Sequence, residues 1–207
     1  MSKIVLYDYP KSSASYRVRI ALNLAGLSHE RVMVNLLERE QIWPEHLARN
    51  PQGFVPVLDI DGHRFTQSLA ILEYLDSTRG LALLPDNPVK RARVRALAMV
   101  IAVDLHPVCN LSVSNRATGG EEPARTDWMQ EFIGRGLVAF EAMLGGFEQA
   151  PFCSGGRPGL ADLCLIPQLY NADRWGVLLD RMPRIRRVRE ACDRLPAFTD
   201  AHPDRQG

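Results

Sequence analysis

The stretch Lys11-Ser-Ser-Ala-Ser-Tyr-Arg-Val-Arg-Ile-Ala-Leu22 decides the fold, because it joins an apolar strand-like run to a helix through a loop of small hydroxyl side chains. The run before it, residues 4–6, is Ile-Val-Leu, and the apolar residues after it recur at helical spacing up to Gly26. Ser12, Ser13 and Ser15 therefore stand at a predicted helix start, where unpaired N–H groups and the helix dipole favour an anion. Either one serine is simply an N-cap or the loop binds a ligand, and the fragment alone favours neither.

Composition limits the class of protein. The 207 residues are 46% hydrophobic, which is enough to fill a core without disulfide staples. The 25 basic and 24 acidic side chains leave a net charge of +1, so no overall field favours nucleic acid or an anionic membrane as a partner. The first residues contain no apolar signal-peptide core, and no apolar run approaches the roughly 20 residues of a membrane span. We therefore expect a cytoplasmic enzyme or binding protein.

The cysteines argue against a metal centre or a dithiol redox centre in the protein itself. None of the four stands in a C-x-x-C pair or at metal-ligand distance from a histidine: Cys109, Cys153, Cys164 and Cys192. We expect them to be buried small hydrophobic residues. Because the first hundred residues contain no cysteine, thiol chemistry in that half requires a bound thiol.

The first part of the chain predicts the order βαβαββα. A second strand is expected over residues 29–34, and a loose helix or loop over the polar residues 35–50. Two short strands, 54–60 and 63–66, flank Asp61-Gly62, a dipeptide typical of a tight hairpin. Pro56 cannot donate a ladder hydrogen bond, so it marks a strand start or edge, and its peptide bond is a candidate for the cis form. The next helix is expected to begin near Ser68.

The second part of the chain predicts helices only. Residues 84–88 resemble a linker, and Asn87-Pro88 is typical of an N-cap followed by a first-turn proline. Residues 163–170 are apolar nearly all round, as in a central helix. Three further helices are expected from stripes at helical spacing: Val89, Ala92, Ala96, Leu97, Val100 and Ile101; Met129, Phe132, Ile133, Gly136, Phe140, Met143 and Leu144; Ile185, Val188, Cys192 and Leu195. We therefore predict an α/β domain over residues 1–83, a linker over 84–88 and an all-helical domain over 89–207.

Four motifs, in this order along the whole chain, resemble one family. Residues 12–21, Ser-Ser-Ala-Ser-Tyr-Arg-Val-Arg-Ile-Ala, are similar to the S-S-C-S-x-R-V-R-I-A motif of the zeta class of glutathione transferases, the maleylacetoacetate and maleylpyruvate isomerases. Residues 110–113, 161–168 and 171–174 are similar to the same class, and Val55-Pro56 and Gln67-Ser68 fit the family's order of elements. The resemblance implies the glutathione transferase fold, a thioredoxin-like domain joined to a helical domain, with glutathione as cofactor.

The resemblance also implies how glutathione is held. Its γ-glutamyl carboxylate is expected at the helix start formed by Gln67 and Ser68, and its cysteinyl backbone beside the backbone of Val55. Its sulfur is then expected near Ser12 and Ser13. A hydroxyl donor and a helix N-terminus lower a thiol pKa from its reference value of about 8.5, and each unit favours the thiolate by about 1.4 kcal/mol.

Further site residues follow from the same resemblance. Pro107 is expected to bend the first long helix of the second domain over the glutathione site, with His106 and Asn110 directed toward it. A buried histidine with only a structural role is the alternative for His106. The candidates for binding the two carboxylates of the substrate are Lys11, Arg17 and Arg174, and for Arg17 a structural ion pair is the alternative. No residue is assigned to a metal.

The sequence departs from the family pattern at three places. Ala14 stands where the family often has cysteine, so the serines must act alone. Gly53-Phe54 stands where a polar side chain commonly precedes Val-Pro, which removes one contact for the glycyl end of glutathione. Gly159 replaces the serine or threonine of a capping box, so Asp162 loses its reciprocal partner and we expect a modest loss of stability.

These observations predict a glutathione-dependent cis-trans isomerase of a maleyl β-diketo acid, maleylacetoacetate or maleylpyruvate, in the breakdown of aromatic amino acids or other aromatic compounds. One alternative is a general glutathione transferase or dehalogenase that acts on other electrophiles. The other is a binding protein with this fold but no turnover, although such a protein would not need the serines and Gln67. The resemblance further implies a homodimer, and the stripe from Val89 to Ile101 would then be only partly covered by its own chain.

Overall fold

The computed structural model describes residues 3–148 and 150–206, which fall into two compact units. One unit contains the chain up to Leu81 together with the segment from Pro196 onward, and the other runs from Ala82 to Leu195. The prediction that the helical domain extends to residue 207 is therefore wrong for the last segment. Its helices α10 (Pro196–Thr199) and η3 (Pro203–Arg205) belong to the first unit, where Phe198 and Ala201 are buried.

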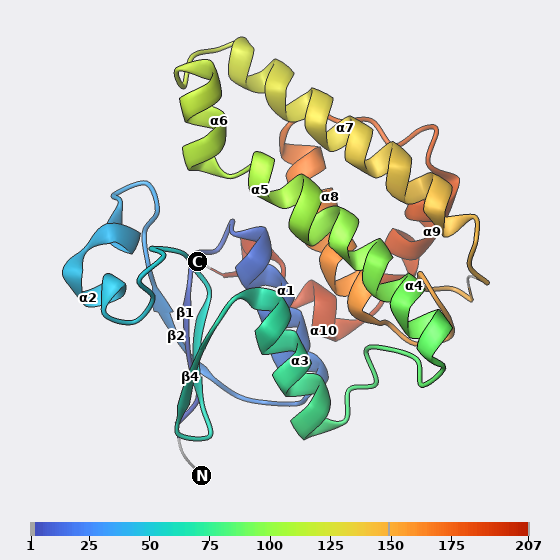
Figure 1. Cartoon of the computed structure of the whole chain (residues 1–207), viewed down its shortest axis with the longest axis horizontal. Helices are drawn as coiled ribbons and strands as arrows, with labels where there is room; N and C mark the ends of the chain where they lie inside the picture. Colours follow the sequence, from blue (N-terminus) through green and yellow to red (C-terminus); the bar gives the residue numbers. More distant parts are fainter. Residues whose placement is uncertain (1–2, 149, 207) are drawn as a thin grey trace. The chain divides into compact units, whose positions relative to one another are not determined.

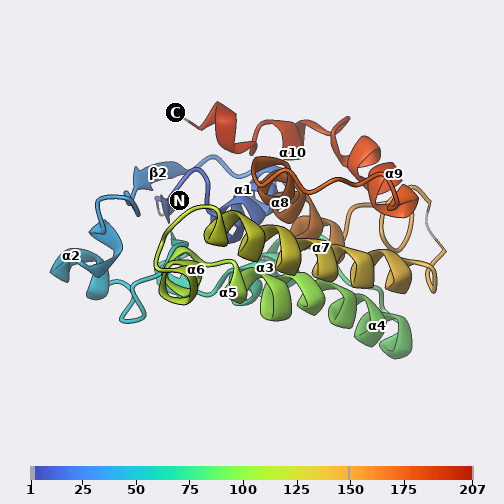
Figure 2. The ribbon, with the colours of Figure 1, turned by 90° about the horizontal axis from the view of Figure 1, so that it is seen from above.

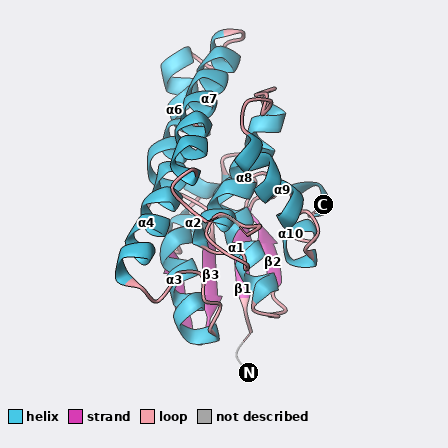
Figure 3. Cartoon of the chain, turned by 90° about the vertical axis from the view of Figure 1, so that its right-hand side faces the viewer, coloured by secondary structure: helices cyan, strands magenta, loops and turns pink. Residues whose placement is uncertain are grey.

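The first unit is built on a four-stranded mixed sheet in the order β2-β1-β3-β4. Its strands are β1 (Val5–Asp8), β2 (Glu30–Met33), β3 (Val57–Ile60) and β4 (His63–Thr66). Strand β1 is parallel to β2 and antiparallel to β3, and β3 is antiparallel to β4. Figure 3 shows these strands as one layer. The predicted order βαβαββα and the thioredoxin-like arrangement are confirmed.

Helices cover the sheet. Helices α1 (Ser13–Leu24) and α3 (Ser68–Arg79) pack against each other on one face, and η1 (Glu40–Ile42) and α2 (Pro44–Leu47) lie on the other side (Figure 1). Asp61 and Gly62 have φ angles of 54° and 80°, the positive values that a type I′ hairpin turn requires at both central positions. The predicted hairpin is therefore confirmed. Pro56 directly precedes β3, and the Val55–Pro56 bond is cis.

In the described residues, the second unit consists of helices, apart from one isolated β-bridge between Phe152 and Gly155. It contains α4 (Pro88–Met99), the π-helix η2 (Val100–Leu105), α5 (His106–Val108), α6 (Leu111–Thr118), α7 (Ala124–Leu144), α8 (Leu160–Arg174) and α9 (Pro183–Cys192). Helix α8 is central, as predicted, since α4, α7 and α9 all pack on it and Leu163 to Leu169 are all buried. Figure 2 shows α4 and α7 side by side. Asn87 caps α4 by accepting from the N–H groups of Val89 and Lys90, as predicted.

The predicted stripe on α4 is only partly right. Leu97 and Ile101 are fully buried, but Val89 is 66% exposed, and Ala92 and Ala96 are also exposed. The buried face starts instead at Val94. Five residues turn a helix by about 140°, so Val89 lies far round from Val94. The helix carries two apolar stripes, and helical spacing alone did not distinguish the one that its own unit covers.

Two further structural findings concern the described residues. No single helix in them is long and apolar enough to span a membrane, although the bent pair Pro88–Val108 and Leu111–Thr118, at 47°, passes the same test of length and composition. They contain no group of three or more histidine, cysteine or acidic side chains placed to hold a metal ion.

Candidate active site

The sheet topology brings three predicted binding groups to one place. Because β1 is antiparallel to β3 and β3 is antiparallel to β4, the carboxyl ends of β1 and β4 and the amino end of β3 meet at one end of the sheet. Ser12 follows β1, Ser68 follows β4, and Val55 precedes β3. The first unit therefore gathers two helix starts and one free strand end, although these lie far apart in the sequence.

The start of α1 is capped by its own serine. The Ser12 Oγ accepts a hydrogen bond from the N–H of Ser15 at 3.2 Å, and the N–H of Ser12 donates to the carbonyl of Tyr9 at 2.9 Å. The cap uses a lone pair of the hydroxyl and leaves its hydrogen for another acceptor. Ser12 can therefore be both an N-cap and part of a ligand site, because its half-buried hydroxyl can cap the helix through its oxygen and donate its hydrogen to an anion. Ser13, at the first helical position, is 7% exposed.

The start of α3 is different. Its N-cap residue, Gln67, has a φ of 67° and makes no side-chain capping bond, so no side chain of that residue occupies the first N–H groups. Its side-chain amide donates instead to the Gln52 Oε1 at 2.8 Å. A positive φ in a residue other than glycine is uncommon and is held by the surrounding structure. An uncapped helix start favours an anion such as a carboxylate.

Arg17 connects the two helix starts. It lies on α1 and is 1% exposed, and its Nη1 donates to the Ser68 Oγ at 3.2 Å. This bond leaves the Ser68 hydroxyl hydrogen directed elsewhere, as a donor. The Arg17 guanidinium is therefore buried and donates to the first residue of α3. By contrast, the other two cations proposed to bind the substrate, Lys11 and Arg174, are exposed.

Two side chains that the sequence analysis did not single out fix the peptide before Val55. The His46 Nε2 and the Asn50 Nδ2 both lie 2.9 Å from the carbonyl oxygen of Phe54. This carbonyl and the Val55 N–H belong to one planar peptide group and point in opposite directions, so two donors on the oxygen orient the N–H. His46 and Asn50 are 2% and 3% exposed. Both residues are polar and lie in the segment 35–50, which was predicted to be a loose helix or loop, so the sequence did not predict that they would be buried.

The backbone conformation and close packing at position 53 explain why a glycine stands there. Its φ is +65°, and a Cβ at this position would lie 3.1 Å from the backbone oxygen of Gln41. A side chain at this position would therefore strain the backbone and crowd this oxygen. The next residue, Phe54, is 48% exposed and offers an apolar surface beside the strand end.

In the second unit, the helix before Pro107 changes its winding. The prediction was a bend at the proline, and the structure places the π-helix η2 immediately before His106 and Pro107. A proline lacks the N–H that would bond within the helix and its ring collides with the preceding turn, so a wider turn is one way to accommodate it. His106 and Asn110 are both half-buried, and Asn110 is the N-cap residue of α6 but makes no side-chain capping bond.

Lys11 and Arg174 are exposed cations. Neither makes an ion pair with the residues that the structure describes. The Arg174 guanidinium lies 5.9 Å from the centre of the Tyr170 ring, which orients it at the end of α8 without neutralising it. Both side chains therefore keep a charge that a carboxylate could bind.

The start of α8 corrects the expectation about Gly159. The Asp162 carboxylate accepts from the N–H groups of Gly159 at 2.8 Å and Cys153 at 2.9 Å, so half of the capping box is present. Burial raises the pKa of Asp162, and these two donors oppose that shift. A Cβ on Gly159 would lie 2.9 Å from the carbonyl oxygen of Leu83. The glycine is therefore a consequence of close backbone packing, and on this geometry we no longer expect it to cost stability.

The protein's own thiols are not activated. Burial raises the pKa of Cys109 to about 12, and it raises the pKa of Cys153 and of Cys192 well above that of an ordinary thiol. All four cysteines are free, and only Cys109 is less than fully buried. A thiolate at the α1 start would have to come from a bound molecule.

Comparisons with known proteins agree with this geometry. A family model described as the N-terminal domain of glutathione S-transferase matches residues 2–77, and one described as the C-terminal domain matches residues 122–194. Maleylacetoacetate isomerase of Rhizobium meliloti is 57% identical over 99% of this chain and 98% of its own.

Solved structures are also similar. Maleylacetoacetate isomerase from Anaeromyxobacter dehalogenans, with glutathione bound in its active site, has a TM-score of 0.89 and 44% identity over 99% of this chain and 96% of its own. The holo structure of a maleylpyruvate isomerase, a bacterial glutathione S-transferase of the zeta class, has a TM-score of 0.92 and 38% identity over 98% of both chains. The chain therefore belongs to the zeta class of the glutathione S-transferase family.

Proposed function

We propose that this protein is a glutathione-dependent cis-trans isomerase of a maleyl β-diketo acid, such as maleylacetoacetate or maleylpyruvate. The observation that carries the proposal is the α1 start, where the Ser12 hydroxyl caps the helix through its oxygen and keeps its hydrogen as a donor. Relatives named maleylacetoacetate isomerase support the choice of reaction. The aromatic breakdown pathway that supplies such an acid is part of the same proposal.

The first unit fits glutathione at three points. The uncapped start of α3, with Ser68 and the exposed amide of Gln67, suits the γ-glutamyl carboxylate. Val55 lies outside the ladder, which begins at Val57, so its backbone can pair with the cysteinyl part of the peptide. The sulfur would then lie at Ser12 and Ser13. From the second unit, we propose His106 and Asn110 as further contacts, on the family pattern.

When bound, glutathione supplies a thiolate that adds to the conjugated double bond, allows rotation about the resulting single bond and is released by elimination, so it is neither consumed nor oxidised. The protein's residues make this possible at neutral pH. The Ser12 hydroxyl donates to the sulfur, and the α1 dipole favours its negative charge. Lowering the thiol pKa by two units would favour the thiolate by about 2.8 kcal/mol.

The substrate's carboxylates would be bound by Lys11 and Arg174, whose charges are not neutralised within the described part of the chain. We no longer assign Arg17 to the substrate, because its burial and its bond to Ser68 place it on the glutathione side. Lys11 follows β1 and immediately precedes Ser12, which keeps a positive charge beside the proposed sulfur position.

The test is an absorbance assay of maleylpyruvate and maleylacetoacetate loss with and without glutathione. Lys11→Ala and Arg174→Ala should each lose about 2–4 kcal/mol of transition-state binding, roughly 30- to 800-fold in kcat/KM, because a partly desolvated carboxylate loses its charge-assisted partner. Conjugation of glutathione to a neutral aromatic electrophile is the matched control and should be nearly unchanged. Equal losses in both reactions, or isomerisation without glutathione, would contradict the proposal.

A homodimer and a cytoplasmic location complete the proposal. The outer stripe of α4 and η2 is apolar and exposed, with Val89 at 66%, Met99 at 41% and Val103 at 51% exposure, and Ala92 and Ala96 between them. Such a stripe suits a two-fold interface with a second copy. Free cysteines support a reducing compartment. A stable 23 kDa monomer in sedimentation at micromolar concentration would contradict the dimer.

A further inference from the structure

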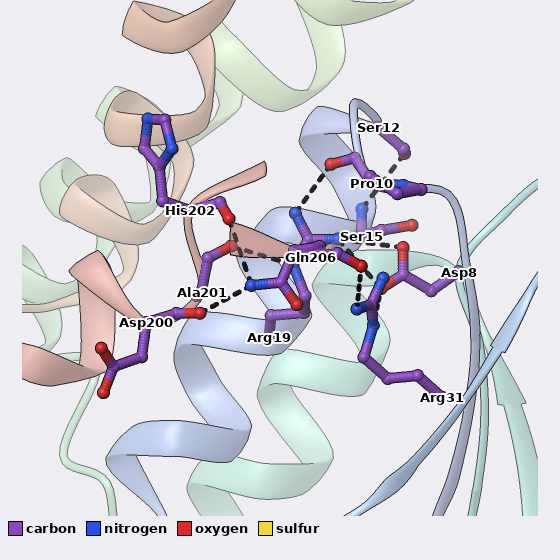
Figure 4. A network of polar contacts seen from close by, with 10 residues as sticks. All are labelled: Asp8, Pro10, Ser12, Ser15, Arg19, Arg31, Asp200, Ala201, His202 and Gln206. Atoms are coloured by element: carbon purple, nitrogen blue, oxygen red, sulfur yellow. Dashed lines mark hydrogen bonds and ion pairs between the residues drawn. The ribbon is translucent and has the colours of Figure 1, made fainter. Parts of the chain in front are cut away.

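The C-terminal segment is bound to the α1 loop through one buried arginine. Arg19 is 1% exposed, and each of its three guanidinium nitrogens makes a hydrogen bond (Figure 4). Its Nε donates to the carbonyl of Ala201 at 3.0 Å, its Nη2 to the carbonyl of Pro10 at 2.9 Å, and its Nη1 to both carboxylate oxygens of Asp8 at 2.9 Å. One planar group therefore connects the end of β1, the loop that leads to Ser12 and the end of the chain.

A second arginine, Arg31, also links Asp8 to the C-terminal segment. Asp8 is fully buried and also accepts from the Arg31 Nε at 3.0 Å, while the Arg31 Nη1 donates to the carbonyl of Gln206 at 2.8 Å. Burial lowers the pKa of Arg19, and the Asp8 carboxylate opposes that shift. One carboxylate is thus shared by two arginines, and each arginine also donates to a carbonyl of the C-terminal segment, Arg19 to Ala201 and Arg31 to Gln206.

The segment is held in the shape that presents its carbonyl to Arg19. The side-chain amide of Gln206 donates to the carbonyls of Asp200 at 2.6 Å and His202 at 3.1 Å, on either side of Ala201. Upstream, the Tyr16 hydroxyl donates to the carbonyl of Phe198 at 3.2 Å. The carbonyl of Ala201 is therefore fixed from both directions, and the segment forms an anchor for Arg19.

The Arg19 Nη2 binds the loop that precedes Ser12, the residue at the proposed sulfur site. The carbonyl of Pro10 belongs to the planar peptide that precedes Lys11, and Ser12 is the next residue. The Ser12 N–H donates back to Tyr9, so residues 9–12 form one tight turn whose outer carbonyl is held by Arg19. An error of about 1 Å in a catalytic group can reduce a rate by about 100-fold.

We propose that Arg19 is a positioning residue for the sulfur site and that the segment Pro196–Gln206 is its anchor, so the end of the chain helps to set the thiolate pKa of bound glutathione. This inference rests on the proposed function. A merely structural role for Arg19 predicts lower stability with an unchanged thiolate pKa in the folded protein. A positioning role predicts a changed thiolate pKa at unchanged glutathione affinity, because the α3 and Val55 contacts are separate from this network.

Two variants test it. Arg19→Lys keeps the charge but has one nitrogen in place of three, so it cannot hold Asp8, Pro10 and Ala201 together. Truncation after His202 keeps Arg19 and removes Gln206, which shapes the anchor. The control is Glu141→Gln in the second unit, where the carboxylate accepts from the N–H groups of Arg184 at 3.1 Å and Ile185 at 2.9 Å and the change should lower stability alone.

The thiol pKa of bound glutathione is titrated by ultraviolet absorbance, and its Kd is measured by calorimetry. We expect Arg19→Lys to raise the thiol pKa by about one unit, truncation to raise it by about 0.3–0.5 units, and Glu141→Gln to leave it unchanged, with every Kd within about threefold of the wild type. If Arg19→Lys does not fold, the thiol pKa of glutathione bound to the truncated protein tests the inference.

The outcomes separate the inference from the proposed function. A wild type that binds no glutathione would overturn the proposed function and the inference with it. A wild type that binds glutathione with a lowered thiol pKa, beside folded variants that keep the same pKa, would overturn the inference alone. An equal shift in Glu141→Gln would also overturn it, because general loosening would then be the cause.

Discussion

The starts of α1 and α3 lie at the same end of the sheet, and each has a serine, yet they offer opposite chemistry. At α1 the Ser12 oxygen is used by the helix and its hydrogen is available. At α3 the N–H groups have no side-chain cap from Gln67, and the Ser68 oxygen accepts from Arg17. The first arrangement suits a sulfur anion that needs one donor, and the second suits a carboxylate that needs several. The serine at the N-cap of α1 and the serine at the first helical position of α3 therefore suit different anions because of the hydrogen bonds around them.

Within the comparison of the two helix starts, the largest effect is expected from removing the arginine that donates to Ser68 at the start of α3. Arg17→Met should weaken glutathione binding by about 2–3 kcal/mol, roughly 30- to 150-fold in Kd, because a charge-assisted bond to Ser68 and a buried positive charge near the carboxylate are both lost. The thiol pKa of the glutathione that still binds should not change. Calorimetry and ultraviolet titration measure the two quantities, and a raised thiol pKa at unchanged Kd would reverse the assignment of the two helix starts.

The complementary change is at α1. Ser12→Ala should raise the thiol pKa of bound glutathione by about one to two units, with the Kd within about threefold, and should lower the free energy of unfolding by about 1 kcal/mol through loss of the cap. The thiolate is present above its pKa, so the acid limb of the pH-rate profile should move to higher pH. Ser12→Thr keeps both the cap and the donor and is the control. If Ser12→Ala loses stability but keeps the wild-type pH profile, the hydroxyl is only a cap.

The strand end between the two helix starts should behave like α3 but more weakly. Asn50→Asp removes the donor to the Phe54 carbonyl and keeps the acceptor for the Gln52 N–H. We expect glutathione to bind about 5- to 10-fold less tightly, about 1–1.4 kcal/mol, with an unchanged thiol pKa, since the Val55 N–H loses its orientation. His46→Gln retains an N–H donor and should lie closer to the wild type. Equal Kd values for Asn50→Asp and the wild type would remove the backbone of Val55 from the binding site.

The features that the sequence predicted correctly are those with local causes. Asp61-Gly62 turns the hairpin because its two residues accept positive φ, and α8 is central because its residues 163–170 are apolar nearly all round. The family itself was also predicted correctly, because its motifs are contiguous in the sequence. The arrangement of Ser12, Val55 and Ser68 followed once the strand order was known.

The features that were missed depend on distant partners. The hydrogen bonds from Tyr16, Arg19 and Arg31 to the C-terminal segment are accepted by its carbonyl groups, which every residue type possesses, so no side-chain pattern indicates them. His46 and Asn50 are a local exception: the Phe54 carbonyl that they bind lies only eight and four residues further along the chain, but every residue has a carbonyl and the sequence does not show which one needs donors. On α4, two apolar stripes have the same period, and only the packing of α7 and α8 selects Val94, Leu97 and Ile101.

The start of α8 gives the last and smallest prediction, because there the Asp162 carboxylate already accepts from the Gly159 N–H. Restoring the missing hydroxyl with Gly159→Ser would be expected from sequence to stabilise the helix. We expect it instead to destabilise the protein by about 1 kcal/mol, since a Cβ would lie 2.9 Å from the Leu83 carbonyl, which already accepts from the N–H of Leu160. Gly134→Ala is the control: it lies within α7, a Cβ there meets nothing within 4 Å, and the change should add about 0.5–1 kcal/mol. Urea unfolding measures both, and glutathione affinity should not change. A stabilised Gly159→Ser protein would mean that the segment around Leu83 yields readily, and that the α8 start, like the α1 start, can be capped by a serine.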